Sequence, residues 1–372
     1  MSDLDSWLRL SLIPGVGNTS LIRLLTAFGS PEAVLASSRG MLAPHLSSAQ
    51  CDALLAGPDA AELDAARAWL EQPGNSLMTL ADEDYPRTLL EIADPPAILY
   101  CKGQRALLGR PGLGMVGSRN ATPQGVRDAE AFAHALSDAG FTIISGLALG
   151  IDAAAHRGGL AGAGSSVAII GTGIDRIYPA RNKTLAHQLA ENGLIVSEFP
   201  LGTAPLPGHF PRRNRLISGL SRGVLVVEAA PDSGSLITAR VATEQGREVF
   251  AIPGSIHSPL ARGCHALIKQ GAKLVESAAD ILDELTWLRQ DRPQGESLAA
   301  CPSQVQQRLA PPVQPESVSD PVLDALDGAP TTLDTLAQRT GLTLDALSAK
   351  LLTLELDGRI ASLPGGRYQK IH

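Results

Sequence analysis

Four turns in this sequence combine glycine with serine or threonine, and each follows a short apolar run. They span residues 117–120 (GSRN), 145–152 (SGLALGID), 171–175 (GTGID) and 231–238 (PDSGSLIT). Small side chains expose backbone N–H groups, and the dipole of a following helix attracts an anion. One glycine turn is weak evidence, since any strand–helix connection can need a positive φ. Four together indicate a phosphate-binding rim built from Gly117, Ser118, Ser145, Gly146, Gly150, Gly171, Thr172, Gly173, Gly234 and Ser235.

Cations near these turns could extend the contact along a phosphate chain. Arg119 follows the first turn, and a guanidinium can hold a phosphate with two parallel N–H groups. Arg181 and Lys183 follow the third turn. A basic segment from Pro207 to Arg222 contains no acidic residue and includes Arg212, Arg213 and Arg215. The structural alternative is that these arginines lie on a solvated helix face.

Three aromatic residues fall on expected loops, where they could stack on bases: Tyr178, Phe199 and Phe210. The simpler alternative is that they anchor the loops through apolar contacts.

Groups suited to catalysis are few. Asp152 and His156 are four residues apart on one helix face and could form an acid–base pair, although such a pair more often fixes the start of a helix. His265 beside Cys264 suggests packing or an interface. The sequence has no Walker phosphate-binding loop and no HExxH. Its GxSxG match (GLSRG, 219–223) comes before an expected strand and its GxGxxG match (GLGMVG, 112–117) falls on one, so neither forms the turn from a strand into a helix. We therefore expect no catalytic residue, no metal and no cofactor.

Composition bounds the class of protein. The 372 residues are 44% hydrophobic and 19% charged, which predicts about two or three folded domains. The formal net charge is −7, so the whole surface is not that of a polyanion-binding protein. No run of about 18 apolar residues indicates a membrane span. The four cysteines form no CxxC pair, and the first residues do not resemble a secretory signal, so we expect a cytoplasmic protein.

The turns need a scaffold, and the pattern between residues 77 and 288 predicts a doubly wound parallel α/β sheet, because continuous apolar runs alternate with helical stretches. In such a sheet, ligands bind at the carboxyl ends of the strands. The expected strands are Ala97–Cys101, Leu113–Gly117, Phe141–Ser145, Ser166–Gly171, Leu194–Ser197, Gly223–Glu228 and Glu248–Ile252. The expected helices are Pro123–Ala139, Ile151–Ala161, Lys183–Asn192, Ser235–Gln245 and Ala261–Gln270.

Residues 1–76 read as a helical domain. Its helices Leu4–Ile13 and Thr19–Phe28 flank a PGVG turn, with Asn18 as the expected cap of the second helix. This is a helix–hairpin–helix pattern, whose glycine amides can approach a DNA phosphate. The alternative is a small helical bundle with a glycine turn.

Residues 289–320 are rich in proline, glutamine and serine and predict a flexible linker. Residues 321–372 predict a winged helix, with helices Asp320–Asp327, Thr332–Thr340 and Thr343–Asp357 before two strands. The third helix is acidic, whereas a DNA-reading helix presents basic or amide groups. We therefore expect a protein-contact module or a weak DNA contact here.

Six long strings, in the same order along residues 77–285, resemble the DNA-processing protein A (DprA/Smf) family. They begin with GMVGSRNATPQG (114–125) and SGLALGIDAAAHRGGL (145–160) and include PRRNRLISGLSRG (211–223) and SGSLITA (233–239). The resemblance implies an extended Rossmann-like domain that binds single-stranded DNA, forms a homodimer and loads the RecA recombinase. Carried over by motif, the DNA-binding residues are Gly117, Ser118, Arg119, Ser145, Gly146, Gly150, Asp152, Lys183, Arg212, Arg213, Asn214, Arg215, Ser218, Gly234, Ser235 and Thr238.

The same resemblance implies a dimer face around His265, Lys269 and Leu274. Lys269 stands where some relatives are expected to have glutamine, so the dimer contacts at that position can differ.

The competing hypothesis for the function is a related α/β enzyme that cleaves a nucleoside monophosphate, with Glu228 or Glu244 acting on the glycosidic bond. The basic segment is too long for one nucleotide, which favours DNA binding.

Overall fold

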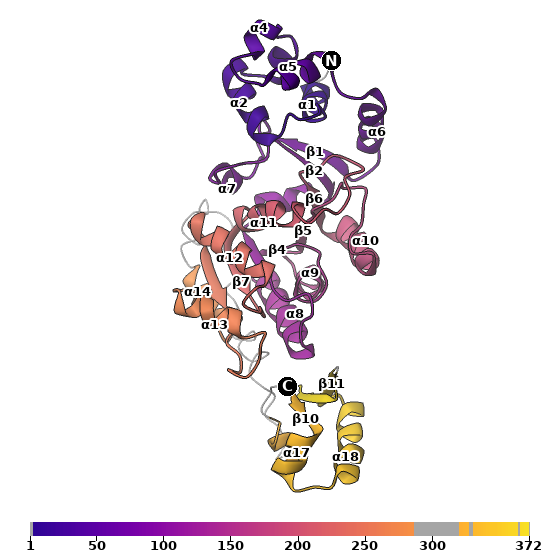
Figure 1. The fold of residues 1–372 in the computed structure, drawn as a ribbon, viewed down its shortest axis with the longest axis vertical. Coiled ribbons are helices and arrows are strands. Elements are labelled where there is room, and N and C mark those ends of the chain that lie inside the picture. The colour runs from indigo at the N-terminus through magenta and orange to yellow at the C-terminus, as the bar shows by residue number, and fades with distance from the viewer. Residues whose placement is uncertain (1–2, 286–319, 327–329, 364, 372) are drawn as a thin grey trace.

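A computed structural model describes residues 3–285, 320–326, 330–363 and 365–371. Almost all of the expected linker, 289–320, lies outside the described residues. Figure 1 shows the N-terminal helices at one end of the molecule, followed by the large sheet with its helices.

Six helices precede the sheet: α1 (Asp3–Ser11), α2 (Asn18–Phe28), α3 (Pro31–Leu35), α4 (Arg39–Leu42), α5 (Ser48–Ala56) and α6 (Ala60–Leu70). Their shared core includes the buried side chains of Trp7, Leu24 and Trp69. The expected cap of α2 was wrong. The helix starts at Asn18, its N-cap is Gly17 without a side-chain bond, and the Asn18 amide instead contacts the chain at Asp94 and Pro95.

The central sheet has nine strands in the order β1-β2-β6-β5-β4-β3-β7-β8-β9. Strands β3 to β9 pair in parallel, while β1 and β2 add an antiparallel edge. The strands are β1 (Asn75–Thr79), β2 (Ile98–Gly103), β3 (Gly112–Val116), β4 (Thr142–Ser145), β5 (Ser166–Ile169), β6 (Leu194–Ser197), β7 (Ser221–Val226), β8 (Glu248–Ala251) and β9 (Lys273–Leu274).

Helices cover both faces of this sheet, which confirms the predicted doubly wound fold. On one face α8 (Pro123–Asp138), α9 (Ile151–Ala161) and α14 (Ala278–Glu284) bury Leu136 and Ile281. The other face is covered by α11 (His209–Gly219), α12 (Gly234–Glu244) and α13 (Arg262–Lys269), which bury Leu216 and Cys264. The remaining elements are the helix α10 (Lys183–Asn192) and the short turns of helix α7 (Arg87–Leu90), η1 (Arg105–Gly109) and η2 (Ala180–Asn182).

The C-terminal segment forms a small domain with its own core, including Leu336, Leu347 and Ile360. Its helices are α16 (Pro321–Asp324), α17 (Leu333–Thr340) and α18 (Leu344–Leu356). Three antiparallel strands complete it: β10 (Thr331–Thr332), β11 (Ile360–Leu363) and β12 (Arg367–Lys370). Three helices followed by a β-hairpin are the predicted winged helix.

Candidate functional site

A cavity of about 720 Å³ lies at the carboxyl ends of β3 and β7. From β3 the chain runs through β4, β5 and β6 to one side of the sheet, and from β7 it runs through β8 and β9 to the other. This reversal makes the gap between β3 and β7 the topological switch point, where open α/β sheets bind ligands. This switch-point cavity brings together nine predicted residues: Gly117, Ser118, Arg119, Asp152, Arg213, Asn214, Gly234, Ser235 and Thr238.

Arg213 forms the floor of the switch-point cavity. Its side chain comes from α11, is only 4% exposed, and donates to the carbonyl oxygens of Gly146 (2.5 Å) and Ile169. A Cβ on Gly146 would lie 2.3 Å from the guanidinium, so a glycine is required for this approach. Burial lowers the pKa of Arg213 to about 10, an effect that nearby Asp152 opposes, so the side chain stays charged near neutral pH.

Asp152 and His156 hold the turn between β4 and α9. The Asp152 carboxylate accepts from the backbone N–H groups of Gly146 (3.2 Å) and Ala148 (3.3 Å). His156 is fully buried, with Nε2 accepting from Leu147 N (3.2 Å) and Nδ1 2.8 Å from the Ser166 hydroxyl. Burial lowers the pKa of His156 to about 3 and raises that of Asp152, although Arg213 opposes the latter shift. These contacts favour the structural reading of the pair, a fixed helix start.

The edge of the switch-point cavity combines a cation with aromatic rings. The Arg119 side chain is exposed, and its guanidinium lies 5.5 Å from the centre of the Phe210 ring. Phe210 contacts Tyr178 at 5.8 Å between ring centres, and Tyr178 is 48% exposed. Both rings line the cavity, so planar apolar surface lies beside the positive charge.

The N-terminus of α12 supplies the opposite wall. Ser233 is the N-cap, and its hydroxyl accepts from Ser235 N at 3.3 Å. No heavy atom lies within 4 Å of a Cβ placed on Gly234, so the first turn of the helix faces open space. Our candidate set omitted Ser233. Its signal in the sequence was a serine directly before the helix, the preferred N-cap type.

Other predicted residues do not line the switch-point cavity. Three are buried hydroxyls that donate to main-chain carbonyls: Ser145 to Met115, Thr172 to Arg176, and Ser218 to Arg215 within its own helix. Gly146, Gly150, Gly171 and Gly173 also lie outside the lining. A ligand-binding role stays a prediction for these seven residues, as it does for the nine that line the cavity.

Arg181 and Lys183 are exposed on η2 and α10, away from the cavity lining, and their DNA contact also stays a prediction. Between them lies Asn182, which we did not single out. It is 8% exposed and donates to the carbonyls of Leu147 (2.8 Å) and Ala148 (3.1 Å). It therefore ties this loop to the turn that Asp152 holds.

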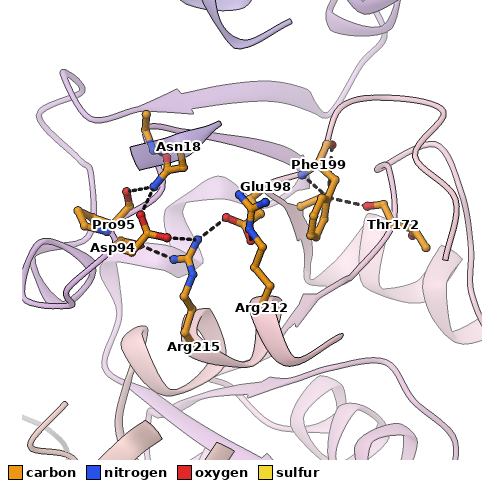
Figure 2. Close-up of polar contacts among 10 residues, drawn as sticks. Asn18, Asp94, Pro95, Thr172, Glu198, Phe199, Arg212 and Arg215 are labelled. Atoms are coloured by element: carbon orange, nitrogen blue, oxygen red, sulfur yellow. Dashed lines mark hydrogen bonds and ion pairs between the residues drawn. The ribbon is translucent and has the colours of Figure 1, made fainter. Parts of the chain in front are cut away.

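Arg212 and Arg215 have a counter-charge that the local sequence does not show. Both form ion pairs with Glu198, whose side chain is 2% exposed; the Arg212 pair is 3.0 Å long. Arg215 also reaches Asp94 at 3.5 Å (Figure 2). Burial raises the pKa of Glu198, and the two arginines oppose that shift. Neither Arg212 nor Arg215 lines the switch-point cavity.

The PGVG turn faces a second cavity of about 550 Å³. Gly15 and Gly17 line it together with Glu62, Glu198 and Arg212. Arg212, the one Lys or Arg of this lining, is already paired with Glu198, and Glu62 adds a further carboxylate. This favours a helical bundle with a glycine turn over a helix–hairpin–helix DNA contact.

The two glutamates considered for glycosidic cleavage are not placed for it. Glu228 binds Thr122, the N-cap residue of α8, with its carboxylate accepting from Thr122 N (2.9 Å) and from the Thr122 hydroxyl (2.6 Å). Burial raises the pKa of Glu228, and these hydrogen bonds oppose the shift. Glu244 is the last residue of α12, about 15 Å along the helix from the turn that lines the cavity.

In the described part of the chain, no cluster of three His, Cys, Asp or Glu side chains has the geometry to bind a metal ion. Within the same ranges, no helix is long and apolar enough to cross a bilayer.

The fold and the site define a Rossmann-like protein whose switch-point cavity is lined by two arginines and two aspartates, flanked by a helical and a winged-helix domain. Residues 76–286 match the family described as DNA recombination-mediator protein A, and residues 306–366 match the DprA winged helix domain. The chain is 41% identical to protein Smf of Escherichia coli, over 98% of this chain and 96% of that protein. The chain belongs to the DNA-processing protein A (DprA/Smf) family.

Solved structures agree with this assignment. The X-ray structure of DNA processing protein A from Streptococcus pneumoniae has a TM-score of 0.66 at 39% identity, covering 75% of this chain and 95% of that one. The Helicobacter pylori protein, described by its single-stranded DNA binding mode, has a TM-score of 0.52 at 30% identity. That match covers 57% of this chain and 96% of the other.

Proposed function

We propose that this protein binds single-stranded DNA without sequence preference, through the switch-point cavity. The observation that carries the proposal is the buried, charged Arg213 at the cavity floor. Its hydrogen-bond acceptors are neutral, two main-chain carbonyls and Asn214 Oδ1 at 3.0 Å. The nearby Asp152 carboxylate accepts from the main-chain amides of Gly146 and Ala148. A phosphate in the cavity would meet this charge, the α12 N-terminus and Arg119.

The cavity's other features favour a nucleic acid strand over a small anion. Its volume, about 720 Å³, exceeds what one phosphate needs, and it is lined by Tyr178 and Phe210. Aromatic faces accept any base, so stacking adds affinity without reading sequence. The single-stranded DNA binding described for the Helicobacter pylori relative supports the same ligand.

A titration of fluorescently labelled oligo-dT against a duplex of equal length, each at two salt concentrations, tests this function. We expect the protein to bind oligo-dT more tightly than duplex and to lose affinity steeply with salt. Equal affinity for both would contradict the proposal. So would release of a base from a nucleoside monophosphate by a protein that ignores oligo-dT in dilute buffer.

We further propose that the protein acts in the cytoplasm as a homodimer that loads RecA onto the bound strand. The family description, a recombination mediator, supports this role. The expected dimer face includes Lys269 on α13 and Leu274 on β9, the edge strand of the sheet. Leu274 is 44% exposed, and His265 Nε2 lies 3.0 Å from the Gly254 carbonyl.

Leu274→Glu tests the dimer, because it places a charge on an apolar edge. We expect light scattering to show a dimer for the wild type and a monomer for the variant.

RecA loading is tested by the DNA-dependent ATPase of RecA on single strands covered with a single-strand-binding protein. The wild-type protein should shorten the lag before RecA begins to hydrolyse ATP. An unchanged lag would contradict the loading role.

A further inference from the structure

Asn18 connects the N-terminal helices to the sheet. As the first residue of α2, it sends its side-chain amide toward the segment that leads into β2. Asn18 Nδ2 donates to Asp94 Oδ1 (2.5 Å) and to the Pro95 carbonyl (2.8 Å), and Asn18 Oδ1 accepts from Ala97 N (2.8 Å). One half-buried side chain therefore makes three hydrogen bonds to residues almost eighty positions away in the sequence.

From Asp94 the contacts continue into α11, as Figure 2 shows. Arg215 donates to the Asp94 carbonyl at 2.5 Å and pairs with Glu198. Glu198 in turn pairs with Arg212, one turn earlier on the same helix. Arg215 is 14% exposed and Glu198 only 2%, so these charges are shielded from water and depend on one another.

The opposite face of α11 belongs to the switch-point cavity. Arg213 and Asn214 line it, while Arg212 and Arg215 face Glu198. A helix advances 100° per residue, so a rotation that moves one face moves the other. The Arg215 carbonyl also accepts from Gln245 Nε2 (3.2 Å), next to the end of α12, the second helix of the cavity.

We propose that Asn18 and Glu198 are positioning residues, which couple docking of the N-terminal helical domain to the placement of Arg213 in the switch-point cavity. The proposal rests on the proposed single-stranded DNA binding. It makes the helical domain a support of the binding site that does not itself touch the strand.

Asn18→Ala is the sharper test, because it removes these three hydrogen bonds without leaving a buried charge unpaired, as Glu198→Ala would. Its matched control is Asn75→Ala, which removes one hydrogen bond, from Asn75 Nδ2 to the Trp69 carbonyl (2.7 Å), between the same helical domain and β1. Full-length chains are compared by hydrogen exchange of the α11 amides and by oligo-dT affinity at two salt concentrations.

We expect Asn18→Ala to speed exchange in α11 and to weaken oligo-dT binding by about fivefold, the effect of one net hydrogen bond. The salt slope should stay as in the wild type, because no phosphate contact is removed. Asn75→Ala should leave both α11 exchange and affinity unchanged.

Faster exchange confined to α2, with α11 and the affinity as in the wild type, would overturn the inference. The same holds if both variants weaken binding equally, since that would mean general destabilisation. A wild type that ignores oligo-dT would overturn the proposed function instead, and α11 exchange in Asn18→Ala would still report whether the two domains are coupled.

Discussion

Neighbouring arginines in this protein have different surroundings and so different uses. Arg213 is buried under the switch-point cavity, Arg212 and Arg215 are held by Glu198, and Arg119 is exposed beside Phe210. Sequence reasoning identified the basic segment but not its counter-charge, because Glu198 is supplied by a separate loop. Asn18 was assigned to its own helix for the same reason: its long-range partners are invisible in local sequence.

Arg119→Ala should weaken binding to all single-stranded sequences equally. Its guanidinium is exposed at the edge of the switch-point cavity, so its loss removes a phosphate contact without disturbing the core. We expect the salt slope of oligo-dT binding to fall by about one unit. Arg23→Ala, on the helical domain, is the matched control and should leave the slope unchanged. A slope that is also unchanged in Arg119→Ala would exclude a phosphate contact there.

His156 should make stability depend on pH. Burial lowers its pKa from 6.5 to about 3, so the folded state holds it neutral while the unfolded chain takes up a proton below pH 6.5. Its stabilising contribution is present above pH 6.5 and is lost as pH falls toward 3, by up to about 1.4 kcal/mol per pH unit. Urea unfolding of wild type and His156→Gln at pH 7.5 and 5.0 measures this. The wild type should lose more stability than the variant, and equal losses would contradict the assignment.

At the scale of elements, the strands and helices with a clear local pattern could be predicted from the sequence. The elements that depend on packing or pairing with other parts of the chain could not. The predicted bounds of α9, α10 and β6 match the structure, because apolar periodicity and flanking glycines define them locally. Helix α11 was not predicted as a helix, since its segment carries proline and glycine, and its packing against the sheet through Leu216 and Ile217 stabilises it. Strands β1 and β9 exist through pairing with distant partners.

Gly150→Ala tests the close contact between the turn that follows β3 and the start of α9. Gly150 is the N-cap of α9 with φ +75°, and a Cβ there would lie 2.2 Å from the Ser118 carbonyl oxygen. We expect a loss of roughly 1–3 kcal/mol in unfolding free energy. Gly234→Ala, in the first turn of α12, has no heavy atom within 4 Å of its new Cβ and should change stability by less than about 0.5 kcal/mol. Equal stabilities of the two variants in urea would contradict this account.

At the scale of the whole molecule, the distribution of charge differs between the domains and indicates which of them contacts DNA. The net charge is −7, yet residues 112–288, which contain the switch-point cavity, hold equal numbers of basic and acidic residues. In the winged helix, the expected DNA-reading helix α18 gives little for a phosphate to bind. Lys350, the only Lys or Arg of α18, pairs with Asp320 at 3.3 Å, and Glu355 on the same helix accepts from the Ser362 hydroxyl at 2.6 Å.

A chain that ends at residue 290 should therefore keep oligo-dT affinity within about threefold of the full chain, with the same salt slope, because its phosphate contacts are intact. The winged helix has its own hydrophobic core, so its removal leaves the core of the sheet unbroken. Arg119→Ala in the same assay serves as the reference for the loss of one phosphate contact, seen as a lower affinity and a smaller salt slope. If truncation instead removed most of the affinity or flattened the salt slope, the winged helix would be part of the DNA site. RecA loading that fails while oligo-dT binding persists would identify the winged helix as the protein-contact module.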